Sequence, residues 1–191
     1  MRLISLFFFF LVQVSVFGDT TSSQPNSIEL SGGVNTNQSR GRGFLMGQEK
    51  KFFPMIGILY QREVADSFHL GVSLRSILIS TEVKSGSFVS LYNSKTKIAP
   101  TPLDLTGTYY FMSDSSFQPF LRGYVGVARI LVKGPGIKYD KNLYHLGLGG
   151  GFRYFFSESF YGLTEIGINR FQNSDVKQNS FYGNLGLGLT F

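Results

Sequence analysis

The closing stretch from Phe181 to Phe191 (FYGNLGLGLTF) alternates without interruption between two kinds of side chain. Aromatic, leucine and glycine residues take every second position, and small or polar residues and one tyrosine lie between them. Because successive side chains of a β-strand point to opposite faces, one face is apolar and the other is small and polar. In a soluble barrel the apolar face points inward, whereas in a membrane barrel it points into lipid. The stretch predicts a barrel strand of one of these two kinds.

The composition narrows the class of protein further. The chain has 191 residues, with 23 glycines, 20 phenylalanines and 10 tyrosines, and only 16% are charged. This composition without helical periodicity favours a single all-β domain. Cysteine is absent, which excludes disulfides, thiolate metal sites, cysteine nucleophiles and a lipoprotein anchor. Two histidines alone lack the ligands for a metal site, so we expect no cofactor.

The first residues have the pattern of a secretory leader. Arg2 precedes an apolar run that ends at Phe17 and is followed by a polar segment. The run is roughly 15 residues, shorter than the roughly 20 that a membrane-spanning helix needs. We therefore expect a cleavable signal peptide over 1–18, a short periplasmic segment over 19–26 and a barrel over 27–191. An uncleaved membrane anchor is the alternative for the first segment.

Eight segments of strand character follow the leader, the smallest number in bacterial outer-membrane barrels. They span 27–36, 52–62, 67–79, 101–112, 118–132, 143–156, 160–171 and 181–191. The connections 62–66, 112–117 and 157–159 are short, whereas 36–51, 80–100, 133–142 and 172–180 are longer and polar. Short periplasmic turns alternating with long outer loops are typical of a membrane barrel with both termini in the periplasm.

Aromatic residues flank the short connections, which favours the membrane over the soluble barrel. They are Tyr60, Phe68, Phe111, Phe117, Phe156 and Phe160, and Phe191 falls at the same level. Such a girdle suits a membrane interface, where a ring with an apolar body is stable. The predicted fold is thus an all-β, eight-stranded antiparallel up-and-down transmembrane β-barrel preceded by a cleavable signal peptide.

Three features together resemble a known family. They are the stretch QPFLRGYVG from Gln118 to Gly126, the glycine-rich segment 143–156 and the terminal aromatic residue Phe191. The chain resembles the small outer-membrane β-barrels of the OmpA transmembrane-domain, OmpX and opacity-protein type. The resemblance implies a location in the outer membrane of a diderm bacterium and contact with outer-membrane lipid and lipopolysaccharide. It also implies a last strand read by the assembly machinery, with Phe191 as the signal, and a monomeric protein.

Six charged residues fall on the predicted inner faces of the strands. They are Glu29, Arg75, Asp104, Arg122, Arg153 and Glu165. Buried charges need partners, so these residues predict a salt-bridge network across the lumen. A proton or ion pathway is the alternative. The interior of an eight-stranded barrel is just wide enough for side chains to fill, so we expect no continuous pore. Arg129 is out of phase with Arg122.

The glycine run and the two histidines are the remaining candidates for chemistry in the sequence. The run from Gly147 to Gly151 lacks the third glycine of a dinucleotide-binding fingerprint and precedes no helix, so lumen-facing glycines in a narrow barrel are the better interpretation. His69 and His145 match no lipid A deacylase pattern, because neither has a serine two residues later. Ser73 is the one serine to check against His69. Two lumen histidines sharing hydrogen bonds are the expected arrangement.

Basic residues gather in the predicted long loops, including Arg40, Arg42, Lys50, Lys51, Lys133 and Lys138. On an outer surface they are candidate contacts for lipopolysaccharide anions, or they are ordinary solvated charges. The formal net charge of +6 does not indicate nucleic acid, since no basic face carries interleaved aromatic residues and the leader directs the protein elsewhere.

The sequence therefore leaves three classes of function. The first is a non-enzymatic outer-membrane barrel with a structural or surface-interaction role, a filled lumen and no open pore. The second is a surface adhesin or immune-evasion protein that acts through the long outer loops and a host or surface ligand. The third is a lipid A-modifying enzyme, which requires a Ser, a His and an acid within hydrogen-bond reach.

Overall fold

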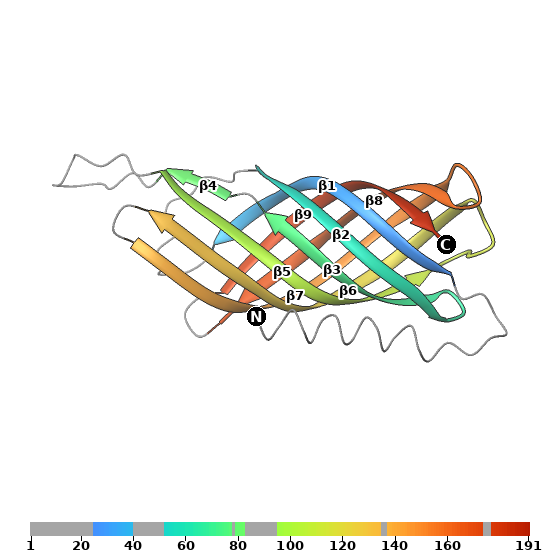
Figure 1. Ribbon diagram of the computed structural model, residues 1–191, viewed down its shortest axis with the longest axis horizontal. Helices are drawn as coiled ribbons and strands as arrows, with labels where there is room; N and C mark the ends of the chain where they lie inside the picture. The colour runs from blue at the N-terminus through green and yellow to red at the C-terminus, as the bar shows by residue number, and fades with distance from the viewer. Residues whose placement is uncertain (1–24, 40–51, 78, 83–94, 135–136, 174–176) are drawn as a thin grey trace.

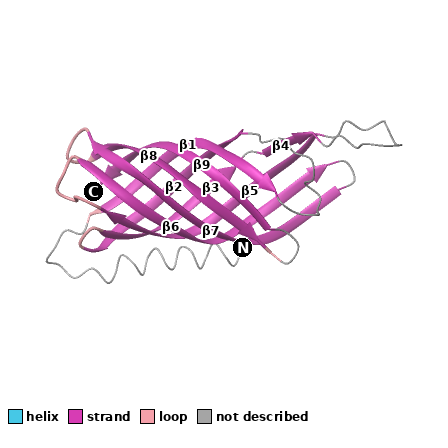
Figure 2. Ribbon diagram, turned by 180° about the vertical axis from the view of Figure 1, so that it is seen from behind, coloured by secondary structure: helices cyan, strands magenta, loops and turns pink. Residues whose placement is uncertain are grey.

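A computed structural model describes residues 25–39, 52–77, 79–82, 95–134, 137–173 and 177–191. These residues form one closed barrel of slanted antiparallel strands (Figure 1). The strands are β1 (Asn26–Ser39), β2 (Phe52–Ala65), β3 (Phe68–Ile77), β4 (Ile79–Glu82), β5 (Lys95–Tyr110), β6 (Phe117–Gly134), β7 (Ile137–Phe155), β8 (Phe160–Gln172) and β9 (Lys177–Thr190). Figure 2 shows the same barrel from behind, built from strands throughout the described part of the chain.

Neighbouring strands pair in sequence order, and two further pairings close the sheet. β1 pairs with β9, and β3 pairs with β5. β3 and β4 together form one barrel strand. Pairing of β3 with β5 reaches Leu74, and pairing of β4 with β5 resumes at Ile79 in the same register. Pro100 and Pro102 of β5 lie in this interval and lack the N–H donor that a ladder needs. The predicted eight-stranded up-and-down barrel is confirmed.

The barrel has two distinct ends. At the turn end, the connections 66–67, 111–116 and 156–159 join successive strands. The first and last strands meet there, because the backbone N–H of Asn26 donates to the carbonyl of Phe191 at 2.8 Å and the reverse bond is also 2.8 Å. At the loop end, the strands lead into residues 40–51, 83–94, 135–136 and 174–176, which lie outside the described residues. The predicted signal peptide over 1–18 also lies outside them.

The strands extend further toward the loop end than the sequence predicted. The expected long loop over 133–142 is wrong, because β6 and β7 stay paired up to Gly134 opposite Ile137. Lys133 and Lys138 are therefore strand residues paired with each other, and β9 likewise begins at Lys177. Beyond the bilayer both faces of a hairpin can be polar, so the alternation that marks a strand is lost there. β1 begins one residue early, at Asn26.

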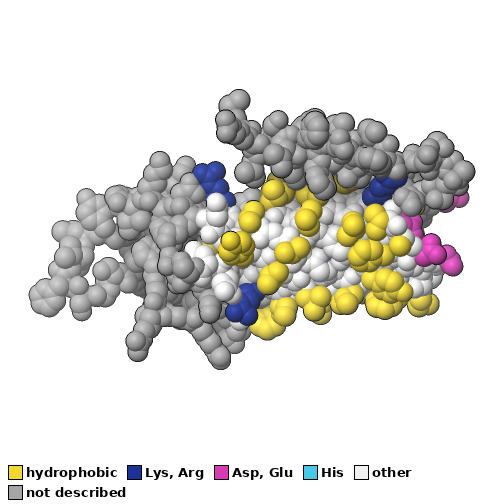
Figure 3. All heavy atoms as spheres, turned by 90° about the horizontal axis from the view of Figure 1, so that it is seen from below, with side chains coloured by type: hydrophobic (Ala, Val, Ile, Leu, Met, Phe, Trp, Pro, Cys, Tyr) yellow, Lys and Arg dark blue, Asp and Glu magenta, His cyan; other side chains and the backbone are white. Residues whose placement is uncertain are grey.

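The outer face of the wall is apolar. Exposed side chains on it include Leu30, Ile56, Leu70, Leu105, Leu121, Val125, Leu148, Ile166, Leu185 and Leu187. Figure 3 shows hydrophobic side chains across the middle of one side of the barrel, with basic side chains toward its two ends. Soluble monomers do not expose a continuous apolar surface of this extent, whereas a bilayer covers one. The predicted orientation, apolar outward, is the one observed.

Aromatic rings collect on this outer face at the turn end. Exposed rings there include Phe68, Phe111, Phe117, Phe156 and Phe160. The ring of Phe68 lies over Gly107, and that of Phe156 over Gly162, so each ring fills the space that its glycine leaves on the wall. Within the described residues, no helix is long and apolar enough to cross a membrane.

Candidate functional site in the barrel lumen

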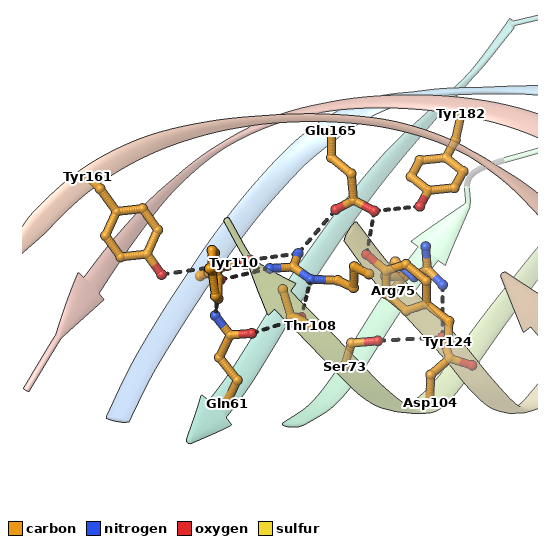
Figure 4. A network of polar contacts seen from close by, with 12 residues as sticks. Gln61, Ser73, Arg75, Asp104, Thr108, Tyr110, Tyr124, Tyr161, Glu165 and Tyr182 are labelled. Atoms are coloured by element: carbon orange, nitrogen blue, oxygen red, sulfur yellow. Dashed lines mark hydrogen bonds and ion pairs between the residues drawn. The ribbon is translucent and has the colours of Figure 1, made fainter. Parts of the chain in front are cut away.

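Arg122 lies at the centre of the lumen and pairs with carboxylates from two other strands. Its Nη1 is 2.9 Å from Oε2 of Glu29 on β1, and its Nη2 is 3.0 Å from Oε1 of the same residue. Nη1 is also 3.1 Å from Oε2 of Glu165 on β8. The Nε donates to the hydroxyl of Thr108 on β5 at 2.9 Å. One buried guanidinium thereby joins four strands of the barrel. Figure 4 labels its partners Thr108 and Glu165.

Tyrosines and an amide complete the hydrogen bonding of the two carboxylates. Tyr124 donates to Oε1 of Glu165 at 2.6 Å, and Tyr182 donates to the same oxygen. Tyr161 donates to Oε1 of Glu29 at 3.1 Å, and Gln61 donates to it at 3.2 Å. Buried charges are stable only when such partners replace water. These residues with Arg122, Glu29, Glu165 and Thr108 are called the Arg122 cluster below.

A second group of polar side chains lies nearer the loop end, around Asp104 on β5. Arg75 of β3 donates to Oδ2 of Asp104 at 2.9 Å, and Ser73 donates to it at 3.4 Å. Nδ1 of His145 lies 2.6 Å from Oδ1 of Asp104, while its Nε2 lies 3.0 Å from the side-chain oxygen of Asn169. These five residues form the Asp104 cluster, and all are buried.

The two clusters touch through Arg75. Its guanidinium carbon is 4.0 Å from the ring centroid of Tyr124, whose hydroxyl belongs to the Arg122 cluster. A cavity of about 10 Å³ lies between the clusters and is lined by Arg75, Arg122, Glu165 and Asn184 among others. That volume holds about one water molecule. At this level the lumen is filled by side chains.

Arg153 lies nearer the turn end, and its side chain contacts an amide and aromatic rings. Its Nε donates to the side-chain oxygen of Gln118 at 2.7 Å. Its guanidinium carbon lies 3.6 Å from the ring centroid of Tyr110 and 5.2 Å from that of Tyr161. The charge of Arg153 is thus stabilised by an amide and by ring faces. His69 lies beside Tyr110 in an edge-on contact, with ring centroids 4.7 Å apart.

Glycines on the lumen face make room for these clusters. A Cβ added at Gly149 would overlap the carboxylate of Glu165 and the hydroxyl of Tyr182. A Cβ added at Gly151 would overlap the backbone of β8 at Thr164. The glycine-rich segment of β7 therefore serves packing in a narrow barrel, as its sequence predicted.

The lumen near the loop end contains a cluster of apolar side chains, which the sequence analysis did not anticipate. It contains the buried side chains of Phe53, Met55, Ile77, Ala128, Leu143 and Phe171. The region begins where His145 stacks on Phe171, with ring centroids 4.6 Å apart. The signal was present but ambiguous, since residues 52–56 of β2 are apolar on both faces and give no alternation.

The structure places all six predicted lumen charges inside the barrel, where they form three separate groups of contacts. Arg122 contacts Glu29 and Glu165, Arg75 contacts Asp104, and Arg153 stands apart from these carboxylates. The sequence did not single out their partners, which are Tyr110, Tyr124, Tyr161, Tyr182 and Gln61. It also did not single out Asn169, which contacts His145. Their positions on the lumen face follow from strand alternation, but the partners come from distant strands.

The structure says less about the remaining residues that the sequence predicted as functional. Arg40, Arg42, Lys50 and Lys51 lie outside the described residues, and the side chains of Lys133 and Lys138 do too. Phe191 is 66% exposed at the turn end, and its role as an assembly signal stays a prediction. His69 and His145 both face the lumen but belong to separate groups of contacts. The described residues contain no group of three or more possible metal ligands.

Comparison with known proteins shows a shared fold. No protein-family model matches the chain, and no curated protein matches it. Neisserial surface protein A superposes with a TM-score of 0.67 at 14% identity, over 87% of this chain and 97% of that one. The chain has the fold of the small outer-membrane β-barrels.

Two further outer-membrane barrels share this fold. The N-terminal β-barrel domain of Pseudomonas aeruginosa OprF gives a TM-score of 0.55 at 13% identity, over 86% of this chain and 97% of that one. The second is Ail, the attachment invasion locus protein of Yersinia pestis, in complex with the heparin analogue sucrose octasulfate. It gives a TM-score of 0.57 at 13% identity, over 88% of this chain and 99% of that one. The resemblance inferred from the sequence is confirmed at the level of fold.

Proposed function

We propose that the protein is an integral outer-membrane β-barrel with a structural or surface-contact role, and that it neither conducts solutes nor catalyses a reaction. The observation that carries this proposal is the filled lumen. Arg122 joins carboxylates from β1 and β8, and four tyrosines and two further arginines fill the lumen around it and on either side of it. An eight-stranded barrel has just enough interior volume for such a filling.

The orientation of the barrel in the membrane follows from the differences between its turn end and its loop end. Short turns face the periplasm in outer-membrane barrels, and aromatic girdles mark the interfaces. The turn end of this barrel carries the three short connections and the exposed rings of Phe68, Phe117 and Phe160. The proposal therefore places Asn26 and Phe191 at the periplasmic side and the loop end at the cell surface, in contact with lipopolysaccharide.

Conductance is the measurement that tests a filled lumen. The protein, expressed into the outer membrane of a diderm host and purified in detergent, is reconstituted into a planar bilayer beside a general porin as positive control. We expect current indistinguishable from bilayer leak, because no water column crosses the Arg122 cluster. Uniform single-channel steps in every preparation would refute the proposal. Protease added to intact cells checks the orientation, with cleavage expected only at the loop end.

A lipid-modifying activity is disfavoured by the order of the polar groups. Ser73 and His145 both contact Asp104, so the acid lies between the hydroxyl and the imidazole. Nucleophilic catalysis needs the imidazole in the middle, to take the proton of the serine. His69, the other histidine, contacts the ring of Tyr110. All four polar residues are at least nine-tenths buried, away from the lipid face.

Surface attachment is the second candidate function. Among the barrels that share the fold, Ail is an attachment invasion protein, and its structure contains a heparin analogue. In this chain such a role depends on residues 40–51 and 83–94, which follow β1 and β4 at the loop end. Binding of immobilised heparin by wild-type protein, lost on shortening either segment without loss of the folded barrel, would support it.

A further inference from the structure

Three arginines on the outside of the barrel have no part in the lumen clusters. Arg129 is out of phase with Arg122 in β6, so its side chain faces outward and is exposed. Arg170 of β8 is likewise exposed on the outer face. Arg62 of β2 lies at the opposite end, beside the turn to β3. An arginine on the lipid face is costly at the membrane centre and costs little near an interface, so the depth of each arginine in the membrane matters.

The depth of Arg129 and Arg170 can be estimated from strand geometry. A strand rises about 3.3 Å per residue, and the strands of such barrels tilt by about 40°. Arg129 then lies about 30 Å above Phe117 of the girdle, and Arg170 lies about 25 Å above Phe160. The apolar band of outer-membrane barrels is about 25 Å tall. Both guanidinium groups therefore reach the level of the outer-leaflet headgroups.

A tyrosine lies between these two arginines on the strand that separates them. Tyr144 of β7 is 73% exposed and faces outward. It is paired with Val127, two residues from Arg129, and with Gln172, two residues from Arg170. Diagonal neighbours of this kind are about 7–8 Å apart, within reach of long side chains. Arg129, Tyr144 and Arg170 therefore form a row across β6, β7 and β8.

Exposed amides extend the row on both sides. Asn142 is the direct register partner of Arg129, and Asn179 is that of Arg170. Both asparagines are exposed on the outer face. The five residues supply two planar cations, two amides and an amphipathic ring, which are groups that bind phosphate and lie at a headgroup level. We call this surface the arginine row.

The charge at the two ends of the barrel supports an anionic partner. Among the side chains that the structure describes, the carboxylates outside the lumen are Glu63, Asp66, Asp114 and Glu158, all beside the turn-end connections. The outer wall near the loop end carries Arg129 and Arg170 and no described carboxylate. Figure 3 shows the acidic side chains gathered at one end of the barrel. This distribution of charge, with carboxylates at the turn end and arginines near the loop end, matches a bilayer whose outer leaflet presents phosphates.

We propose that the arginine row binds the phosphate groups of lipopolysaccharide in the outer leaflet. The inference rests on the proposed orientation, and it moves the lipopolysaccharide contacts from the loops to the barrel wall. Each guanidinium can take a phosphate oxygen pair in a bidentate contact, while Tyr144 lies against the start of the acyl chains. The site fits a lipid with two separated phosphates better than a phospholipid with one.

The test compares two variants that remove outward-facing arginines at opposite ends. R129Q/R170Q removes both guanidinium groups of the row, and R62Q removes the one near the turn end. Full-length proteins, purified without lipopolysaccharide in neutral detergent, are titrated with lipid A bearing two phosphates and followed by native mass spectrometry. We expect about tenfold weaker binding for R129Q/R170Q, because two solvent-exposed charge pairs with phosphate are lost, and wild-type binding for R62Q.

Two probes identify the lipid chemistry, and a mobility control verifies folding. Wild-type protein should bind monophosphoryl lipid A more weakly than the diphosphoryl form. R129Q/R170Q should bind the two forms with equal affinity. Equal binding of diphosphoryl lipid A by all three proteins would overturn the proposal, as would equally tight binding of phosphatidylglycerol by wild-type protein. Heat-dependent electrophoretic mobility confirms that each variant is folded. The proposed function is judged separately by conductance, so a failure of either is distinguishable.

Discussion

The lumen and the lipid face of this barrel are made by alternate residues of the same strands, yet they are stabilised differently. On β9, Leu185 is 70% exposed on the outer wall, and its neighbour Asn184 is 5% exposed inside. The outer wall consists largely of leucine, isoleucine and valine side chains, and none of them needs a particular partner on another strand. The lumen depends on particular partners, such as Arg122 and Glu29, which are 93 residues apart in sequence.

The contrast shows where each face tolerates change. Lipid is a non-directional apolar solvent, so any apolar side chain of moderate size satisfies the outer wall. In the lumen, a group that loses its partner stays buried without water, and the cost is that of an unpaired polar atom or charge. Substitutions that keep polarity should therefore be mild outside, and substitutions that keep size but remove a partner should be severe inside.

The largest effect is expected at Arg122. Replacement by methionine keeps most of the volume but leaves Glu29 and Glu165, 3% and 2% exposed, with no cation between them. Breaking a buried ion pair in this way costs about 3–5 kcal/mol. Urea unfolding of the barrel in detergent, followed by the loss of the fast-migrating folded band, measures the free energy.

A triple variant distinguishes charge imbalance from lost packing. R122M/E29Q/E165Q has no buried charge in the Arg122 cluster and should recover most of the lost stability, because neutral groups can remain hydrogen-bonded to the surrounding tyrosines. If the triple variant is as unstable as R122M, the lumen is sensitive to shape and the electrostatic interpretation of the interior is wrong.

The next effect belongs to the lipid face and depends on depth. Leu185→Arg places a charge in the middle of the apolar wall, where it costs about 2–4 kcal/mol. Asn179→Arg, on the same strand and the same face but near the loop end, costs at most about 1 kcal/mol. Folding into vesicles at a series of urea concentrations compares the two variants. Equal stabilities would mean that this face of β9 is not embedded as its exposure indicates.

The fold could be predicted because the side chains of the outer wall follow a pattern that can be recognised within each strand alone. Alternation along one strand decides which residues face lipid, and the girdle at Phe68, Phe117 and Phe160 marks one end. Strand number and order follow from the spacing of such segments. The pattern fails where both faces have the same polarity, as in residues 52–56 and 133–138, and there the apolar lumen region and the extended β6–β7 hairpin were missed.

The arrangement of the lumen could be predicted only in part. Alternation assigns Arg75, Arg122 and Arg153 to the interior, but it contains no information on distance across the barrel. Whether Arg122 contacts Glu29, or Arg153 contacts Gln118 and rings, depends on the register of strands far apart in sequence. Arg129 illustrates the converse. The sequence shows only that it is out of phase with Arg122, and the paired strands bring Tyr144 and Arg170 beside it on the outer wall.

The smallest expected effect compares two adjacent glycines of β7 that point to opposite faces. A Cβ at Gly151 would overlap the backbone of β8, which no side-chain rotation can relieve, so Gly151→Ala should cost about 1–3 kcal/mol. A Cβ at Gly150 would meet its nearest atom, the carbonyl oxygen of Phe120, at 3.6 Å, an ordinary contact. Gly150→Ala should therefore change stability by less than about 0.5 kcal/mol. Urea unfolding of both variants gives the difference, and equal losses would mean that β7 needs glycine for its backbone conformation, not for the close packing of the interior.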